Sequence, residues 1–184
     1  FCVGTSQGTM SAGACEKEQE VCPVYGVLKQ PSMVDYPGYM AGIILVAGCN
    51  FRCGFCHNCE LMRSHPATLT WADLAVLCDR LKENWANAIV LSGGEPTTAA
   101  SLPALIKFLK TYGWAIKLDT NGSLPAVIER VLPDVDYVAM DVKVPLEKYR
   151  SEMGFYGDPS CISRSIYILE NSAVEHEFRT TVVP

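Results

Sequence analysis

The chain lacks long apolar runs and clusters of positive charge, and each absence excludes a class of partner. A helix that spans a bilayer needs roughly 20 consecutive apolar residues, and no run in this sequence approaches that length. The 15 lysine and arginine residues are scattered and are outnumbered by 20 aspartate and glutamate residues, which gives a net charge of −5. Because nucleic acids are bound by clustered positive charge, we expect neither a nucleic acid nor a membrane as partner.

Signals for export and for disulfide bonding are also missing. The first residues resemble neither a secretory signal peptide nor a transit peptide. The nine cysteines are an odd number and make up about 5% of the 184 residues, which is below the content of disulfide-rich scaffolds. The sequence therefore predicts a cytoplasmic protein whose thiols are reduced.

Length and composition fit one folded domain. Of the 184 residues, 49% are hydrophobic and 19% are charged, so the chain can bury a sizeable core. Residues 1–24 show no apolar period, and we interpret them as an irregular N-terminal segment or the remnant of a larger chain. Residues 25–184 form the predicted domain. We expect it to be truncated at its C-terminal end, because the sequence stops within the apolar run Val182–Pro184.

Short apolar runs alternate with segments of helical period along this domain. Most of these runs are nearly continuous hydrophobes, as expected for strands buried on both faces of a parallel sheet. The expected strands are Gly42–Ala47, Ala88–Leu91, Ala115–Leu118, Tyr137–Met140 and Phe178–Val183. Thr70 and Asp73 have the spacing of a helix-capping box, Ser101 is expected to cap a second helix, and two more helices are expected near 127–131 and 161–171. This order predicts an α/β barrel or an open α/β sheet.

Three cysteines lie within eight residues, at Cys49, Cys53 and Cys56. An extended chain spans at most about 3.6 Å per residue, so side chains this close in sequence can converge on one small object. Thiolates are soft ligands that select iron–sulfur clusters, zinc or copper(I) over hard cations. Three thiolates on a [4Fe–4S] cluster leave one iron without a protein ligand, which suits a chemical site. The spacing therefore favours such a cluster.

Two other interpretations of the cysteines are weaker. A zinc site would use Cys59 or His57 as its fourth ligand, but zinc frameworks usually pair two separate Cys-x-x-Cys knuckles, and the second is missing here. A disulfide framework is disfavoured by the odd cysteine count. We interpret Cys59 as a residue without a metal-binding role, since a fourth protein ligand would close the open iron.

Polar residues follow the carboxyl ends of the first four expected strands, and the last expected strand carries polar residues within its length. In parallel α/β folds these ends meet at one edge, where sites are built. Taken singly, a Gly-Gly turn, a buried aspartate or a strand-end lysine is more often structural than functional. Together with the cysteines they predict one site, and the segments are Ser92–Pro96, Asp119–Gly122, Asp141–Lys143 and Arg179–Thr181.

These residues resemble the radical S-adenosylmethionine superfamily. The cysteine spacing is similar to that family's cluster motif, and Gly93–Pro96 is similar to its motif for the methionyl amine. Further stretches resemble the activating proteins of anaerobic ribonucleoside-triphosphate reductase, which are relatives of the pyruvate formate-lyase activating enzymes; these stretches are 30–38, 48–58, 118–122, 137–143 and 178–184. The resemblance implies a partial (β/α)6 barrel of the TIM type, of which this chain supplies about five β/α units.

The resemblance also implies an activity, its cofactors and its partners. Cys49, Cys53 and Cys56 would hold a [4Fe–4S] cluster whose open iron chelates S-adenosylmethionine. Reductive cleavage of this cofactor would give methionine and a 5′-deoxyadenosyl radical, which takes hydrogen from a glycine of a partner enzyme. The implied partner is anaerobic ribonucleoside-triphosphate reductase, and the electron donor a flavodoxin or a ferredoxin-type protein. The alternatives are activation of pyruvate formate-lyase or another glycyl-radical enzyme, a radical enzyme acting on a small molecule, and an electron-transfer iron–sulfur protein.

Residue roles carry over by position in the matching motifs. Phe55 is expected near the adenine, and Asp141 near the ribose or the metal-bound end. The methionyl amine is expected to meet Gly93, Gly94 and Glu95, and its carboxylate Lys143 and Arg179. Asp119 and Asn121 are expected to contact the cofactor as well. Asp119, Thr120 and Asp141 also match a monovalent cation site of the pyruvate formate-lyase branch.

Overall fold

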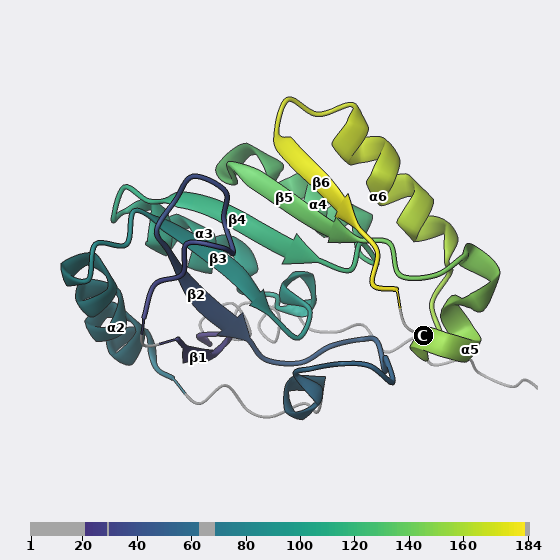
Figure 1. Cartoon of the computed structure of the whole chain (residues 1–184), viewed down its shortest axis with the longest axis horizontal. Coiled ribbons are helices and arrows are strands. Elements are labelled where there is room, and N and C mark those ends of the chain that lie inside the picture. The colour runs from purple at the N-terminus through teal and green to yellow at the C-terminus, as the bar shows by residue number, and fades with distance from the viewer. Residues whose placement is uncertain (1–20, 29, 63–68, 183–184) are drawn as a thin grey trace, which may run out of the picture.

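The computed structural model describes residues 21–28, 30–62 and 69–182, and a six-stranded sheet forms its centre (Figure 1). Strand order follows the sequence. β1 (Val24–Val27) is antiparallel to β2, and the strands from β2 to β6 are mutually parallel. Those five are β2 (Ala41–Val46), β3 (Ala88–Gly93), β4 (Ala115–Thr120), β5 (Tyr137–Asp141) and β6 (Glu175–Arg179). The five parallel strands with their intervening helices confirm the predicted α/β partial barrel. Most of the predicted irregular segment 1–24 lies outside the described residues.

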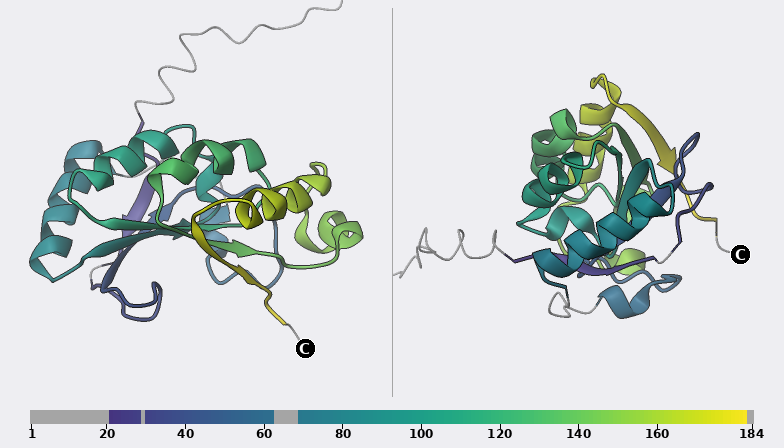
Figure 2. Two further views of the ribbon diagram at one scale, coloured as in Figure 1. Left: turned by 90° about the horizontal axis from the view of Figure 1, so that it is seen from above. Right: turned by 90° about the vertical axis from the view of Figure 1, so that its left-hand side faces the viewer.

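Helices cover one face of this sheet. Figure 2 shows α2 (Trp71–Glu83), α3 (Leu102–Lys110), α4 (Pro125–Val131) and α6 (Ser160–Glu170) along the same side. The remaining helical elements are short: α5 (Tyr149–Met153) and the 3-10 turns η1 (Cys59–Met62), η2 (Pro96–Thr98), η3 (Leu132–Asp134) and η4 (Leu146–Lys148). None of the helices in the described ranges is long and apolar enough to cross a membrane.

The two expected helix caps differ in outcome. The Thr70 side chain accepts a hydrogen bond from the Asp73 amide, and the Asp73 carboxylate accepts one from the Thr70 amide, so the capping box of α2 is confirmed. Ser101 precedes α3, but its side chain makes no capping hydrogen bond. Its φ of −86° and ψ of 5° depart from the extended backbone that N-cap residues use, so its hydroxyl accepts no hydrogen bond from the amides of the first turn of α3.

Strand residues alternate between two apolar clusters, which explains their nearly continuous hydrophobicity. The larger core lies between the sheet and the helices, and includes Leu91, Leu118 and Met140. On the opposite face a smaller cluster gathers Tyr36, Ala41, Ile43, Ala88 and Val90. Tyr36 comes from the β1–β2 connection, so this loop covers the amino-terminal part of the inner face. The carboxyl-terminal part of that face is left to the polar residues described below.

The last predicted strand was wrong in position. β6 begins at Glu175 and ends at Arg179, whereas the apolar run predicted Phe178–Val183. β6 pairs with β5 from Tyr137–Glu175 to Asp141–Arg179. Its alternate residues form ion pairs across the sheet, as Glu177 does with Lys117 and Arg179 with Asp141. Charge pairing, rather than continuous apolar surface, therefore marks this half-exposed strand.

The ends of β2 and β3 approach each other at the level of their backbones. Gly93 has a φ of +115°, and a Cβ on it would lie 2.6 Å from the backbone nitrogen and oxygen of Val46. A Cβ on Gly94 would lie 1.9 Å from the carbonyl oxygen of Gly48. The Gly94 amide donates to Val46 O at 2.9 Å, and the Glu95 amide donates to Gly48 O at 2.7 Å. The two glycines are therefore required by contact between strands.

Gly94→Ala is expected to destabilise the fold, because the new methyl group overlaps a backbone carbonyl that cannot rotate away. Overpacking of this kind costs roughly 1–3 kcal/mol, occasionally more. Urea unfolding of the protein measures this loss. Gly26→Ala is the matched control, since a Cβ there meets nothing within 4 Å. Equal free energies of unfolding for the two variants would contradict the assigned contact.

Candidate active site

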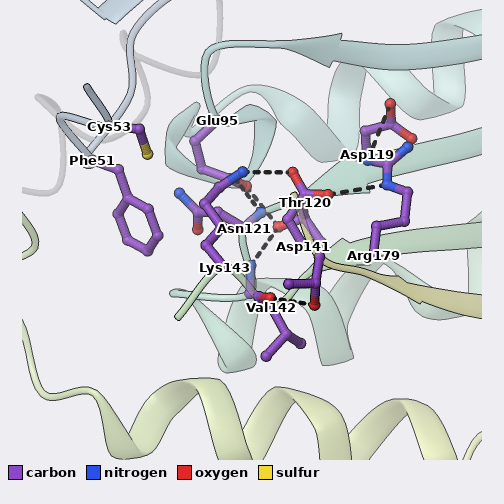
Figure 3. Close-up of polar contacts among 12 residues, drawn as sticks. Phe51, Cys53, Glu95, Asp119, Thr120, Asn121, Asp141, Val142, Lys143 and Arg179 are labelled. Carbon is purple, nitrogen blue, oxygen red and sulfur yellow. Dashed lines mark hydrogen bonds and ion pairs between the residues drawn. The ribbon is translucent and has the colours of Figure 1, made fainter. Parts of the chain in front are cut away.

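A single pocket gathers the polar strand ends and the cysteine loop. It has a volume of about 260 Å³ and opens at the carboxyl edge of the sheet. Every residue named above as a site candidate lines it: Cys49, Cys53, Phe55, Cys56, Gly93, Gly94, Glu95, Asp119, Thr120, Asn121, Asp141, Lys143 and Arg179. Phe51, His57, Asn58, Met62, Ser92 and Thr181 complete the lining. Figure 3 shows Cys53 and Phe51 on one side of the site and Asp119 and Arg179 on the other.

Local hydrogen bonds give the cysteine loop its shape. Gly48, with a φ of +83°, turns the chain out of β2 and donates to Leu61 O at 3.0 Å. The Arg52 guanidinium donates to the carbonyls of Cys49 and Phe51, at 2.6 and 2.7 Å. The Cys56 amide closes a turn onto Cys53 O at 3.2 Å. These bonds orient the three cysteines toward one pocket.

The three thiols differ in their surroundings. Cys53 is buried, Cys49 and Cys56 are half-buried, and Cys59 is exposed. Burial raises the pKa of Cys49 to about 11 and also raises the pKa of Cys53. Since a thiolate is the form that binds metal, loading of these cysteines must release protons.

The donor set fits a cluster better than a single ion. All seven cysteines in the described ranges are free thiols. Within the same ranges, no three histidine, cysteine, aspartate or glutamate side chains are arranged to hold one metal ion. In a [4Fe–4S] cluster each thiolate binds a different iron, so three cysteines around one pocket are a suitable set.

Glu95 ties the end of β3 to the end of β4. Its carboxylate is 1% exposed and accepts hydrogen bonds from the Thr97 amide and hydroxyl, the Thr120 hydroxyl and the Asn121 amide. Burial raises the pKa of Glu95, and these four donors act in the opposite direction. The carboxylate therefore holds the walls of the pocket in register.

A second polar link joins the cysteine loop to β4. The Asn121 side chain donates to Asn50 Oδ1 at 2.9 Å, and the Asn50 side chain donates to Ser123 Oγ at 2.7 Å. Asn50 lies between two of the clustered cysteines, yet sequence analysis assigned no role to it or to Ser123. Their side chains meet only because the fold brings together segments about 70 residues apart, so no local pattern could have shown the link.

Alternating charges cross the inner face over β4, β5 and β6. Lys117 lies between Glu177 and Asp119, at 3.7 and 3.5 Å. Arg179 then contacts Asp119 at 3.6 Å and Asp141 at 3.0 Å, and Asp141 contacts Lys143 at 2.8 Å (Figure 3). We call this set the charge ladder; its members are Glu177, Lys117, Asp119, Arg179, Asp141 and Lys143. Three positive and three negative charges leave the wall of the pocket electrically balanced.

Sequence analysis missed two members, Glu177 and Lys117, and Lys117 is the buried one. It is 3% exposed, and its ammonium donates to the Asp35 carbonyl at 2.6 Å besides facing the two carboxylates. In the sequence it interrupts the apolar strand Ala115–Leu118. The strand alternation that places Leu118 in the core also places Lys117 on the inner face, which was the available signal.

One carboxylate oxygen of Asp119 lacks a hydrogen-bond donor among the described residues. Burial raises its pKa, against the lowering effects of Arg179 and Lys117. Its Oδ1 atom is buried and accepts no hydrogen bond from the described residues. The Lys117 ammonium faces this atom at 3.5 Å, so Oδ1 can still accept a hydrogen bond from a hydroxyl in the pocket.

Comparison with known proteins identifies the family of the chain. The model of the Radical SAM superfamily matches residues 43–184, which include the cysteine loop and all five parallel-strand ends. The chain belongs to the radical SAM superfamily. Members are named for S-adenosylmethionine, and the family implies this cofactor together with a [4Fe–4S] cluster, which the three cysteines suit.

Similar proteins have several activities. The chain is 36% identical over 160 residues to a Methanocaldococcus jannaschii protein named "putative glycyl-radical enzyme activating enzyme", covering 83% of this chain and 65% of that protein. It is 35% identical over 106 residues to 7-carboxy-7-deazaguanine synthase of Neisseria meningitidis, covering 58% of this chain and 45% of that one. The chain thus spans less than two thirds of either relative.

A solved structure supports the fold. The structure of TYW1 with a lysine-pyruvate adduct bound has a TM-score of 0.56 to this chain at 19% identity. The likeness covers 76% of this chain and 54% of that one. At this identity it supports the barrel-like architecture alone.

Lys117→Met is expected to lower the free energy of unfolding by about 3 kcal/mol, because it leaves Asp119 without its buried partner. Urea unfolding measures the loss. Lys110→Met is the matched control: Lys110 pairs with Asp136 at 2.8 Å, but their side chains are 38% and 42% exposed. Removing an exposed pair costs at most about 1 kcal/mol. A loss at Lys117 no larger than the loss at Lys110 would contradict the importance of the buried pairing.

Proposed function

We propose that the protein is a glycyl-radical activating enzyme, with anaerobic ribonucleoside-triphosphate reductase as the favoured partner. The convergence of three free cysteine thiols and five strand ends on one pocket carries the proposal of a radical SAM enzyme. Similarity over 83% of the chain to a protein named as an activating enzyme favours the glycyl-radical branch. A flavodoxin or a ferredoxin-type protein is the proposed electron donor.

When bound, the reduced cluster and S-adenosylmethionine would supply methionine and a 5′-deoxyadenosyl radical able to take hydrogen from a glycine Cα. This chain's residues bind and orient these groups. Cys49, Cys53 and Cys56 would hold three irons. Phe55 would pack on the adenine, and the Lys143 ammonium, 6.0 Å from the centre of the Phe55 ring, would remain beside it.

The charge ladder and the Gly93-Gly94 turn would position the methionyl end. Gly93, Gly94 and Glu95 would face the amine, with the four hydrogen bonds to Glu95 keeping this turn in place. Lys143 and Arg179 would face the carboxylate. Both cations already pair with Asp141, so the cofactor would enter a site whose charges are held in position before binding.

A monovalent cation is proposed next to the cofactor, with Asp119, Thr120 and Asp141 as ligands. The carboxylates of Asp119 and Asp141 and the hydroxyl of Thr120 line the same pocket, which supports this assignment. Asp119 and Asn121 are also proposed to contact the cofactor directly. Oxygen ligands of this kind suit a hard cation.

The pocket also bears on the kind of substrate. A volume of about 260 Å³ is below that of most small-molecule sites, which span roughly 300–1,000 Å³. The cofactor must occupy this space, and Lys117 and Tyr36 fill the inner face beyond it. A glycine presented by a partner protein at the open edge fits this geometry. Activation of pyruvate formate-lyase or another glycyl-radical enzyme is the nearest alternative.

A radical enzyme acting on a small molecule is the second candidate. The 35% identity to a 7-carboxy-7-deazaguanine synthase favours it, but that similarity covers only 58% of this chain. Anaerobic incubation with reductant, S-adenosylmethionine and a candidate partner enzyme separates the two functions. The expected result is a glycyl-radical signal in the electron paramagnetic resonance spectrum of the reductase. Release of 5′-deoxyadenosine with no radical on the reductase or on pyruvate formate-lyase would oppose the proposal.

Cys53→Ala is expected to abolish the [4Fe–4S] absorbance after anaerobic reconstitution with iron and sulfide, because two thiolates cannot hold the cluster. Cys59→Ala is the matched control, as this exposed cysteine lies six residues along the same loop. It should load iron and sulfide as the parent does. A full cluster in Cys53→Ala would refute the ligand assignment, and loss of the cluster in Cys59→Ala would make Cys59 a ligand.

A further inference from the structure

One side of the cysteine loop is covered by a methionine. Cys53 Sγ lies 3.5 Å from Met153 Sδ, and the two residues are 8% and 2% exposed. Met153 is the last residue of α5, a hundred positions along the chain. Neither the cysteine motif nor the strand ends predicted this contact.

The contact is fixed from several sides. The Arg52 amide donates to Met153 O at 2.6 Å, directly before Cys53. Gly154 follows with a φ of +59°, and a Cβ on it would lie 2.9 Å from Arg52 Cβ. The rings of Tyr149 and Phe155 pack on Phe51, with centroids 5.7 and 4.9 Å away. Residues 149–155 therefore brace the loop and hold the thioether over Cys53.

A thioether has no hydrogen to donate, and this property matters next to a cluster ligand. Hydrogen bonds to the sulfurs and access of solvent raise the reduction potential of an iron–sulfur cluster, because both stabilise the added negative charge. Cys49 receives such a bond from the Phe51 amide at 3.4 Å. On the side of Cys53 that faces α5, the neighbouring atom is the sulfur of Met153.

We propose that Met153 is a positioning residue that keeps the potential of the cluster low, by excluding water from Cys53 without donating a hydrogen bond to it. The inference rests on the proposed function, in which a sulfonium carbon–sulfur bond is broken by an electron from the cluster. The cluster must be strongly reducing to break this bond. A side chain that excludes water from Cys53 and donates no hydrogen bond to it favours such a low potential.

The midpoint potential of the reconstituted cluster tests this role, measured by reductive titration followed by electron paramagnetic resonance. Met153→Leu keeps the volume and adds no donor, so its potential should equal that of the parent. Met153→Gln adds an amide donor at similar length and should shift the potential to more positive values. Met153→Ala opens the wall to water and should shift it in the same direction.

Met140→Gln is the matched control. Met140 is 0% exposed, lies on β5 and does not line the pocket, so Met140→Gln makes the same chemical change outside it. It should lower the melting temperature without shifting the potential. A parent-like potential in Met153→Gln would overturn the proposal, as would an equal shift in Met153→Leu and Met153→Gln. If Met153→Gln fails to fold, a parent-like potential in Met153→Ala overturns it. A parent protein that loads no cluster would instead refute the proposed function.

Discussion

The site depends on a contact between two backbones at the ends of β2 and β3. Gly94 lies so close to the Gly48 carbonyl that no side chain fits between them, and two amides bond across the gap. Gly48 begins the cysteine loop, and Gly94 precedes Glu95. This one approach therefore sets the distance between the proposed cluster ligands and the remaining wall of the pocket. Hydrogen bonds to Glu95 link this contact to the end of β4. The hydrogen bond between Asn121 and Asn50 then links β4 to the cysteine loop.

Electrostatic balance is the second condition for this pocket. Charged groups removed from water are costly unless each has a partner. The charge ladder meets that requirement by alternating signs across β4, β5 and β6. Its ends differ in exposure: the side chain of Glu177 is 38% exposed, whereas that of Lys143 is 15% exposed. A wall with fixed, compensated charges suits the proposed ligand, which carries an amine, a carboxylate and a sulfonium, because each of these charges would meet an opposite one already in position.

The local parts of this design were predictable from the sequence, and the non-local parts were not. Cysteine spacing, the Thr70 capping box and the polar ends of four strands are short patterns with direct physical causes. Lys117, Asn50 and Met153 act through partners between 2 and 100 residues away, and Lys117 also lies within an apolar run. The position of β6 failed for a related reason. The alternating charged residues Glu175, Glu177 and Arg179 form a strand only when β5 lies beside them. The apolar residues that follow were therefore the stronger local signal for a strand.

The most direct measurement is electron paramagnetic resonance of the reduced, reconstituted protein with and without S-adenosylmethionine. The account predicts a [4Fe–4S]⁺ signal that changes when S-adenosylmethionine is added, because three cysteines leave one iron open to the cofactor. An identical signal in both samples would mean that the cluster is closed to the cofactor, and would contradict the assignment of this pocket.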